Sequence, residues 1–170
     1  TFSPVNPFGV VIAQKIADNA EDLAQLEARD TGKPMTTARN DMQVLARYFE
    51  YYGGAADKVH GETLPFANGY TALTLREPHG VTGHIVPWNY PLFLAMGPLV
   101  GALSAGNRVM IKMSESTPAT SQLVKDLLGK IFPEDLVCVA LGEAEVGVAF
   151  SKLAFDHLLF TGATSIGKHV

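Results

Sequence analysis

The sequence predicts an α/β fold in which helices cover both faces of a parallel β-sheet. Between residue 81 and the C-terminus, short apolar runs alternate four times with longer segments of helical periodicity. Such alternation is typical of parallel strands joined by crossover helices. The apolar runs are nearly continuous, as they are in strands that are buried on both faces. The 170 residues are 47% hydrophobic and 18% charged, which is enough for a substantial core.

Residues 1–61 are expected to form N-terminal helices that belong to the same domain as the sheet. Residues 1–8 contain two prolines and no periodicity, so we expect a terminal tail there. From Val10 to Gly32 apolar residues recur at helical spacing, with Glu27 on the opposite, solvent-facing side. We expect one helix over this stretch.

A second helix is expected to begin after Thr36 or Thr37, either of which could cap it, and to end near Gly61. It would bury Met42, Leu45, Ala46 and Phe49.

Residues 62–80 are expected to form a β-hairpin arm. Asn68 and Gly69 lie between apolar runs, and this dipeptide is a strong hairpin signal. Residues 70–76 alternate as a half-buried strand would. A hairpin placed here is a candidate to pair with something outside its own domain.

Residues 81–170 are expected to form a Rossmann-like but incomplete domain. The strands are expected at 81–86, 108–113, 136–141 and 157–161, and the helices at 92–105, 117–131, 143–152 and after Gly162. Ligands of such sheets bind beyond the carboxyl ends of the strands. The turns to consider are therefore 87–91, 112–118, 142–145 and 161–167.

Each turn, taken alone, has a functional and a structural interpretation. The Gly-rich turn at 161–167 suits a phosphate, and a simple turn is equally consistent with it. Lys112 and Glu115 could hold a ribose or form a solvated ion pair. Trp88 and Asn89 could be exposed because they have a function, or Trp88 could be buried with its indole N–H hydrogen-bonded.

Several classes of function are not supported by the sequence. Net charge is −4, with 13 basic and 17 acidic residues, so nucleic acid is not an expected partner. Residues 85–107 carry no formal charge, but prolines and glycines interrupt them, and we expect no membrane span. The five His residues lack metal-ligand spacing, so no metal is expected. A single Cys favours a reducing, cytoplasmic location.

Three strings carry a resemblance to a known family. They are Glu-Pro-His-Gly-Val-Thr-Gly-His-Ile-Val-Pro-Trp-Asn-Tyr-Pro (77–91), Ala-Gly-Asn-Arg-Val-Met-Ile-Lys-Met-Ser-Glu (105–115) and Phe-Asp-His-Leu-Leu-Phe-Thr-Gly (155–162). In this order they resemble the NAD-binding region of the aldehyde dehydrogenase superfamily. Residues 20–61 resemble that family's N-terminal helices, and residues 97–170 are most similar to coniferyl-aldehyde-dehydrogenase-like members.

The resemblance implies roles for individual residues. Asn89 matches the residue whose side-chain amide forms half of the oxyanion hole. Lys112 and Glu115 match the pair that holds the adenosine ribose, with Ser114 beside them. A ribose-binding Glu favours NAD over NADP, which stays the alternative.

The remaining positions match residues near the cofactor. The resemblance places Ile85, Pro87 and Trp88 along the cofactor, Gly142 at its adenine end, and Gly162, Ala163 and Gly167 in the turn by the pyrophosphate. Two positions depart from the family pattern: Ala163 stands where Ser is common, and Ser165 where many members have Glu. The hairpin matches the family's oligomerisation arm, which implies a homodimer or homotetramer.

The family's reaction needs a Cys nucleophile, which forms a thiohemiacetal and then a thioester, and a Glu base that activates water. Both lie beyond the segment that matches Val170. Cys138 is expected to be inert on a buried strand. Because both ends look cut, we expect a part of an NAD-dependent aldehyde dehydrogenase that has no turnover alone. Similarity to coniferyl members hints at an aromatic aldehyde.

Two alternatives remain open. The first is a truncated, non-catalytic nucleotide-binding or interaction module. The second is a related reductase of acyl phosphates, against which Pro-Trp-Asn-Tyr-Pro argues.

Overall fold

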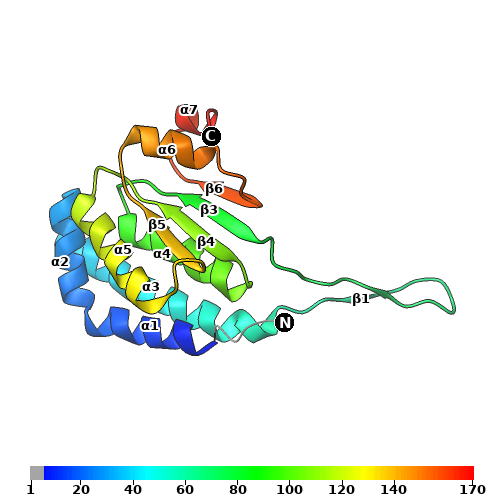
Figure 1. Ribbon diagram of the computed structural model, residues 1–170. Helices are drawn as coiled ribbons and strands as arrows, with labels where there is room; N and C mark the ends of the chain where they lie inside the picture. Colours follow the sequence, from blue (N-terminus) through cyan, green and yellow to red (C-terminus); the bar gives the residue numbers. More distant parts are fainter. Residues whose placement is uncertain (1–5) are drawn as a thin grey trace.

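A four-stranded parallel sheet organises the computed structural model, which describes residues 6–170 (Figure 1). The strand order is β5-β4-β3-β6. The strands are β3 (Val81–Ile85), β4 (Arg108–Lys112), β5 (Val137–Ala140) and β6 (His157–Phe160). The predicted α/β fold is confirmed, and each strand lies within a residue or two of its expected range.

A helix follows every strand of this sheet. These helices are α4 (Pro91–Ser104), α5 (Pro118–Ile131), α6 (Ala144–Ser151) and α7 (Thr164–Gly167). Proline occupies the first turn of α4 and of α5, where its missing N–H has no intrahelical partner to lose and its fixed φ suits a helix. Local signals of this kind explain why the starts of these helices could be predicted.

The N-terminal helices differ from the prediction. They are α1 (Asn6–Asp18), α2 (Ala20–Thr31), α3 (Met35–Ala55) and the short 3₁₀ helix η1 (Ala56–Lys58). One predicted helix is two helices separated at Asn19, and helical structure begins at Asn6 rather than at Val10. Of the expected tail, residues 1–5 lie outside the described residues.

The start of α3 was also predicted too late. Neither Thr36 nor Thr37 caps it, because Pro34, with φ −59° and ψ 139°, already turns the chain into the helix. Its apolar face is buried as expected except that Ala46 is only half-buried.

The position of Glu27 was predicted wrongly. Its side chain is fully buried, whereas helical periodicity placed it on the solvent face. Lys33, beyond the end of α2, folds back to within 2.5 Å of Glu27 Oε1. Periodicity within one helix cannot detect a partner beyond the helix end, which explains the error.

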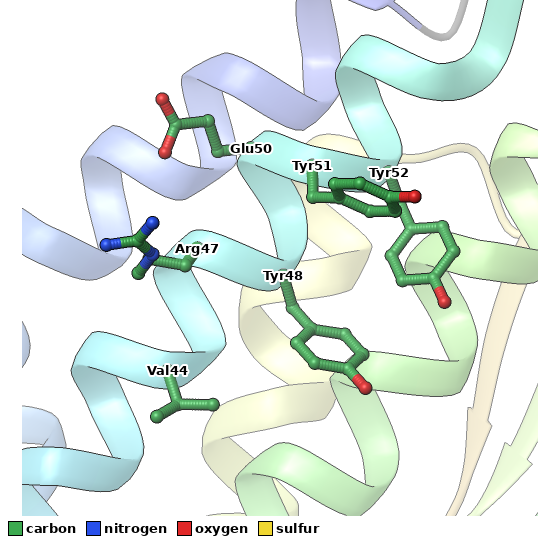
Figure 2. A pocket seen from close by; sticks show the side chains of 6 residues that line it. All are labelled: Val44, Arg47, Tyr48, Glu50, Tyr51 and Tyr52. Atoms are coloured by element: carbon green, nitrogen blue, oxygen red, sulfur yellow. The ribbon is translucent and has the colours of Figure 1, made fainter. Parts of the chain in front are cut away.

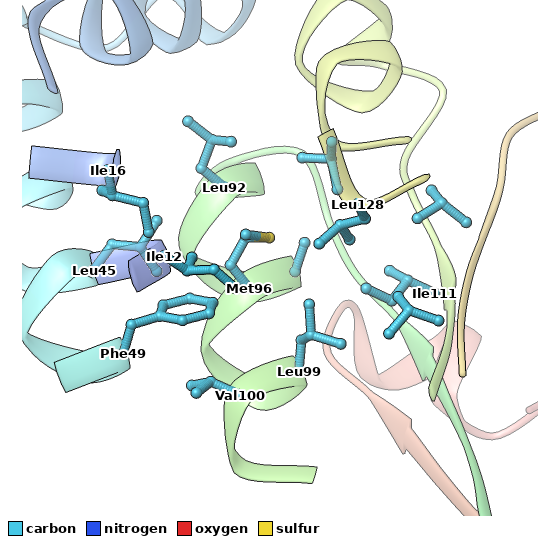
Figure 3. Close-up of a cluster of buried hydrophobic side chains, with 14 of the residues drawn as sticks. Ile12, Ile16, Leu45, Phe49, Leu92, Met96, Leu99, Val100, Ile111 and Leu128 are labelled. Atoms are coloured by element: carbon cyan, nitrogen blue, oxygen red, sulfur yellow. The ribbon is translucent and has the colours of Figure 1, made fainter. Parts of the chain in front are cut away.

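The core lies between the sheet and the N-terminal helices. Figure 3 shows α4 in the middle of this core, with Met96 and Leu92 among side chains from α1 and α3, and Leu99 toward the strands. Helices α4 and α5 cover one face of the sheet, and α1, α2 and α3 pack outside them. Helix α6 lies on the other side of the sheet (Figure 1).

The two faces of the sheet are not equally buried. On β4, Val109 and Ile111 point toward α4 and α5 and are buried, while Met110 between them is half-buried. On β5 the same alternation leaves Cys138 half-buried between Val137 and Val139. The expectation of a fully buried Cys138 is therefore wrong, because the short α6 covers only part of this face.

The hairpin is present and projects from the body of the molecule (Figure 1). Its strands, β1 (Thr63–Leu64) and β2 (Ala72–Leu73), pair antiparallel. The predicted half-buried strand over 70–76 is wrong in both length and burial, since Tyr70 is 75% exposed. No other part of residues 6–170 covers the apolar side chains of this arm, which also include Phe66, Leu73 and Leu75.

Across residues 6–170, no helix is both long enough and apolar enough to cross a membrane. The uncharged stretch over 85–107 instead forms the end of β3, a loop and α4.

Candidate functional site

Strand register brings the four candidate turns to one edge of the sheet. Ile85 is paired with Lys112 on one side and with Phe160 on the other, and Lys112 is paired in turn with Ala140. The ladder continues into the turns, since Val86 N–H donates to Lys112 O (3.1 Å) and Thr161 N–H donates to Ile85 O (3.1 Å). The turns after all four strands therefore lie side by side.

The topology makes the same edge a candidate ligand site. The chain passes from β3 to β4 to β5 in one direction and then returns to place β6 on the other side of β3. Ligands of open α/β sheets bind where strand order reverses in this way. In this chain that point lies between the turn that begins at Pro87 and the turn that begins at Thr161.

The turn after β3 presents polar groups to solvent. Trp88 is 53% exposed, which excludes the interpretation of a buried Trp. Asn89 is also exposed, and its side chain makes no hydrogen bond to any described residue. Pro87 and Pro91 restrict the backbone on either side. An amide donor is thus free to meet a ligand from a stiff loop.

The turn after β4 holds a pair that the sequence indicated. Lys112 Nζ lies 3.5 Å from Glu115 Oε2 and donates to Met113 O at 2.6 Å. The Lys112 side chain is only 5% exposed, whereas that of Glu115 is 48% exposed. Because the Lys is buried, this is not an ordinary solvated ion pair. Ser114, between them, accepts a hydrogen bond from Ser116 N–H at its Oγ.

The turns after β5 and β6 contain the glycines that the sequence indicated. Gly142 has φ +139°, and a Cβ there would lie 2.5 Å from Val146 Cγ2. Cβ atoms at Gly162 and Gly167 would both crowd the Phe160 ring. Ala163 precedes α7, and its carbonyl accepts from the N–H groups of Ile166 and Gly167. Because of these glycines, the two turns present their backbone, rather than side chains, at this edge of the sheet.

Other titratable groups lie away from this edge or are poorly suited to catalysis. Burial, and then Glu134, raise the pKa of the Cys138 thiol, so it is a poor nucleophile. Burial and His157 lower the pKa of His84 to about 4, so its ring is neutral at pH 7. Within residues 6–170 no group of three or more His, Cys, Asp or Glu side chains could hold a metal ion.

One cluster beside the site was not identified from the sequence. Tyr90, next to Asn89, lies under Lys33 from the turn between α2 and α3, and its hydroxyl is influenced by Asp41 on α3. Burial, followed by Asp41, raises the pKa of Tyr90, so the phenol is neutral. Only the place of Tyr90 within Pro-Trp-Asn-Tyr-Pro could have indicated this cluster.

A cavity of about 660 Å³ lies along α3 and is lined by Val44, Arg47, Tyr48, Glu50, Tyr51 and Tyr52 (Figure 2). Ring contacts connect it to the turn after β3. The ring centroids are 5.1 Å apart for Tyr51 and Tyr52, 5.5 Å for Tyr52 and Tyr48, 4.9 Å for Tyr48 and Phe93, and 4.8 Å for Phe93 and Tyr90. A continuous row of aromatic rings therefore leads to the neighbour of Asn89.

Comparison with known proteins identifies relatives of this fold and sequence. A model of the aldehyde dehydrogenase family matches residues 10–170. A Pseudomonas aeruginosa protein named "Probable coniferyl aldehyde dehydrogenase" is 75% identical over 100 residues, which cover 59% of this chain and 21% of that protein. Aldehyde dehydrogenase 1 from Tanacetum cinerariifolium is 40% identical over 163 residues, which cover 93% of this chain and 32% of that protein.

The solved structures agree with the sequence relatives. The structure of betaine aldehyde dehydrogenase from Staphylococcus aureus in complex with NAD+ superimposes with a TM-score of 0.89 at 36% identity. The match covers 97% of this chain and 34% of that one. The chain thus spans between about a fifth and a third of the length of these three relatives.

Proposed function

The chain belongs to the aldehyde dehydrogenase family, and from that premise we propose that it supplies the cofactor edge and one oxyanion donor of an NAD-dependent enzyme. That enzyme would oxidise an aldehyde to a carboxylic acid. One observation carries the proposal: four turns meet at the switch point of the sheet, with Asn89 and the Lys112–Glu115 pair among them.

The residues at this edge fit a dinucleotide. Glu115 offers an exposed carboxylate oxygen for ribose hydroxyls, and Lys112, fixed by its bond to Met113 O, keeps the pair in place. A side chain at Gly142 would crowd Val146, so backbone can approach an adenine group there. The turn with Gly162, Ala163 and Gly167 would face the pyrophosphate, and Ile85, Pro87 and Trp88 would line the cofactor. Bound NAD would supply a hydride acceptor.

Glu115 also supports NAD over NADP. Its carboxylate would repel a 2′-phosphate, and Lys112, whose side chain is 5% exposed, is poorly placed to offset that repulsion. NADP remains the alternative cofactor, and substitution of Glu115 distinguishes between the two.

Asn89 is proposed as the catalytic residue of this chain. Its amide would donate a hydrogen bond to the oxygen of the aldehyde as negative charge develops there. A donor held between two prolines needs little reorganisation at the moment of reaction. We propose that the Cys nucleophile and Glu base come from outside these 170 residues, because the single Cys of the sequence, Cys138, has a raised pKa.

An aromatic aldehyde is the proposed substrate class. The coniferyl aldehyde dehydrogenase relatives carry that substrate in their names. The row of rings from Tyr51 to Tyr90 would offer a planar aldehyde stacking contacts on the way to Asn89.

The hairpin is proposed as an arm that pairs with a second subunit, in a homodimer or homotetramer. Apolar side chains exposed as fully as Tyr70 and Leu75 are typical of surfaces that a partner covers. We accordingly propose that residues 1–61 and 81–170 form one cofactor domain, with 62–80 as the arm between them.

The proposal is tested by Asn89→Ala in the complete protein that carries this chain. We expect kcat for an aromatic aldehyde to fall by about a hundredfold or more, with the NAD+ dissociation constant nearly unchanged by calorimetry. Asn68→Asp, in the arm, is the control and should leave both values unchanged. Equal losses of kcat and of NAD+ affinity would show that Asn89 has a structural rather than a catalytic role. NAD+ binding without any aldehyde oxidation would favour a non-catalytic nucleotide-binding module.

A further inference from the structure

Three charged side chains are buried together where α2 turns into α3. The exposed fractions of the side chains are 0% for Glu27, 12% for Lys33 and 9% for Asp41. Lys33 Nζ lies 2.5 Å from Glu27 Oε1 and 2.7 Å from Asp41 Oδ2. Two carboxyl groups thus share one ammonium group that is largely shielded from water.

Stabilising the α2–α3 corner does not explain this cluster. Buried ion pairs pay a large desolvation cost and are often no more stable than apolar side chains of similar volume. Glu27 Oε2 is buried and has no hydrogen-bond partner among the described residues. The corner is already closed by Gly32, whose φ of 75° ends α2 and whose N–H donates to Ala28 O. The cluster therefore calls for another role.

The fourth member of the cluster is Tyr90. Lys33 Nζ lies 4.4 Å from the centroid of its ring, and burial together with the nearby Asp41 carboxylate raises the pKa of its hydroxyl. The ring is also stacked on Phe93, with centroids 4.8 Å apart and planes 10° from parallel. The Tyr90 ring is thus held between Lys33 and Phe93, and its hydroxyl is under the influence of Asp41 on α3.

The loop around Asn89 has few other contacts to hold it. Asn89 makes no hydrogen bond within residues 6–170, and Trp88 is more than half exposed. Tyr90 is the residue that precedes α4, and its carbonyl accepts the Leu94 N–H at 2.9 Å. Fixing the Tyr90 side chain therefore fixes the peptide that joins Tyr90 to Asn89.

We propose that Lys33, Asp41 and Glu27 are positioning residues that act through Tyr90 to orient the side-chain amide of Asn89. Asp41 holds the hydroxyl of Tyr90, Lys33 lies over its ring, and Glu27 holds Lys33 against that ring. This inference rests on the proposed role of Asn89, but the anchoring of the loop can be measured without catalysis.

The experiment compares Asp41→Ala and Tyr90→Phe with a matched control, Arg39→Ala. Arg39 also links α3 to α2, through Glu21 at 2.8 Å, but this pair is about half exposed and does not touch Tyr90. Trp88 is the single Trp of these 170 residues, so within this chain its fluorescence and its quenching by acrylamide report on the loop. In the complete enzyme, kcat and the KM for NAD+ are measured for each variant.

We expect Asp41→Ala and Tyr90→Phe to make Trp88 more accessible to acrylamide, with no change in Arg39→Ala. In the enzyme, Asp41→Ala should lower kcat by about tenfold, with KM for NAD+ within about twofold of the parent. Only the orientation of the Asn89 amide is lost in this variant. Tyr90→Phe removes one hydroxyl, should fold, and should show a smaller effect of the same kind.

Unchanged Trp88 quenching and unchanged kcat in both variants would overturn the proposal. So would equal losses of kcat and NAD+ binding, which indicate general structural damage. If Asn89→Ala has no effect on turnover, the proposed oxyanion role fails, and the fluorescence comparison still decides whether the cluster anchors the loop.

Discussion

The buried middle of the strands and the exposed turns that follow them have different roles. In the middle of β4, Ile111 is fully buried against α4 and α5. Four residues further along the chain, the turn after β4 exposes Glu115, and the turn after the neighbouring β3 exposes Trp88 and Asn89. Stability and ligand contact are thus separated along each strand, so substitutions in the two regions should affect different measurements.

The largest effect expected is on stability, in the packed region. Ile111→Ala should lower the free energy of unfolding by about 3 kcal/mol, because it leaves a cavity in the core. Met110→Ala, one residue away on the half-buried face, should cost about 1 kcal/mol or less. Urea unfolding of both variants measures the difference. Equal losses would show that both faces of the sheet are equally packed.

The packed region should also make the fold sensitive to acid. Burial lowers the pKa of His84 to about 4, from an ordinary value of 6.5. The unfolded chain therefore binds a proton more readily between these pH values, and stability is lost as pH falls from 6.5 toward 4. The contribution is up to about 3 kcal/mol.

The His84→Gln variant isolates this effect from the titration of carboxylates. Its free energy of unfolding should fall less steeply over that pH interval than that of the parent chain. Parallel pH profiles for the two proteins would refute the assignment to His84.

The glycine of the third turn lies where the two regions meet. Gly142→Ala should cost about 1–2 kcal/mol, because the residue has φ +139° and a Cβ would meet Val146. Gly147, within α6, has no atom near its Cβ position, so Gly147→Ala should stabilise by about 0.5–1 kcal/mol. Thermal unfolding of the two variants should therefore shift in opposite directions.

The last effect is expected on cofactor preference at the edge, with no change in stability. Glu115→Gln should narrow the preference for NAD+ over NADP+ by about tenfold, roughly 1.4 kcal/mol, without changing the melting temperature. The ratio of the two dissociation constants is the measurement. An unchanged ratio would remove Glu115 from the ribose site, whereas a lower melting temperature would assign it to the packed region.

The features that the sequence predicted well are local ones. The strands β3 to β6 are short apolar runs between turn residues, and proline starts α4 and α5, so their ranges could be predicted closely. The sequence also indicated the Lys112–Glu115 pair, because the two residues are close in sequence. For the loop between Pro87 and Pro91 the sequence left exposure and burial open, and the structure decides for exposure.

The features that it predicted poorly depend on distant partners. Glu27 is buried because Lys33 reaches it from beyond the end of α2, and Lys33 is held in turn by Asp41 on another helix. Asn19 separates α1 from α2 although the apolar spacing continues through it. The partial exposure of Cys138 depends on how much of the sheet the short α6 covers. None of these is encoded in the periodicity of one segment.

The position of β6 in the sheet has a consequence for the order in which the molecule assembles. Strand β3 pairs with β4 and β4 pairs with β5, so these contacts can form as soon as each later strand has been synthesised. Strand β6 must instead return to β3, where Asp156 accepts the N–H of Val81, 75 residues earlier. Loop closure over that distance is slow and comes late. The Gly162 turn therefore joins the other three last, so that competence to bind a dinucleotide would mark the completion of folding.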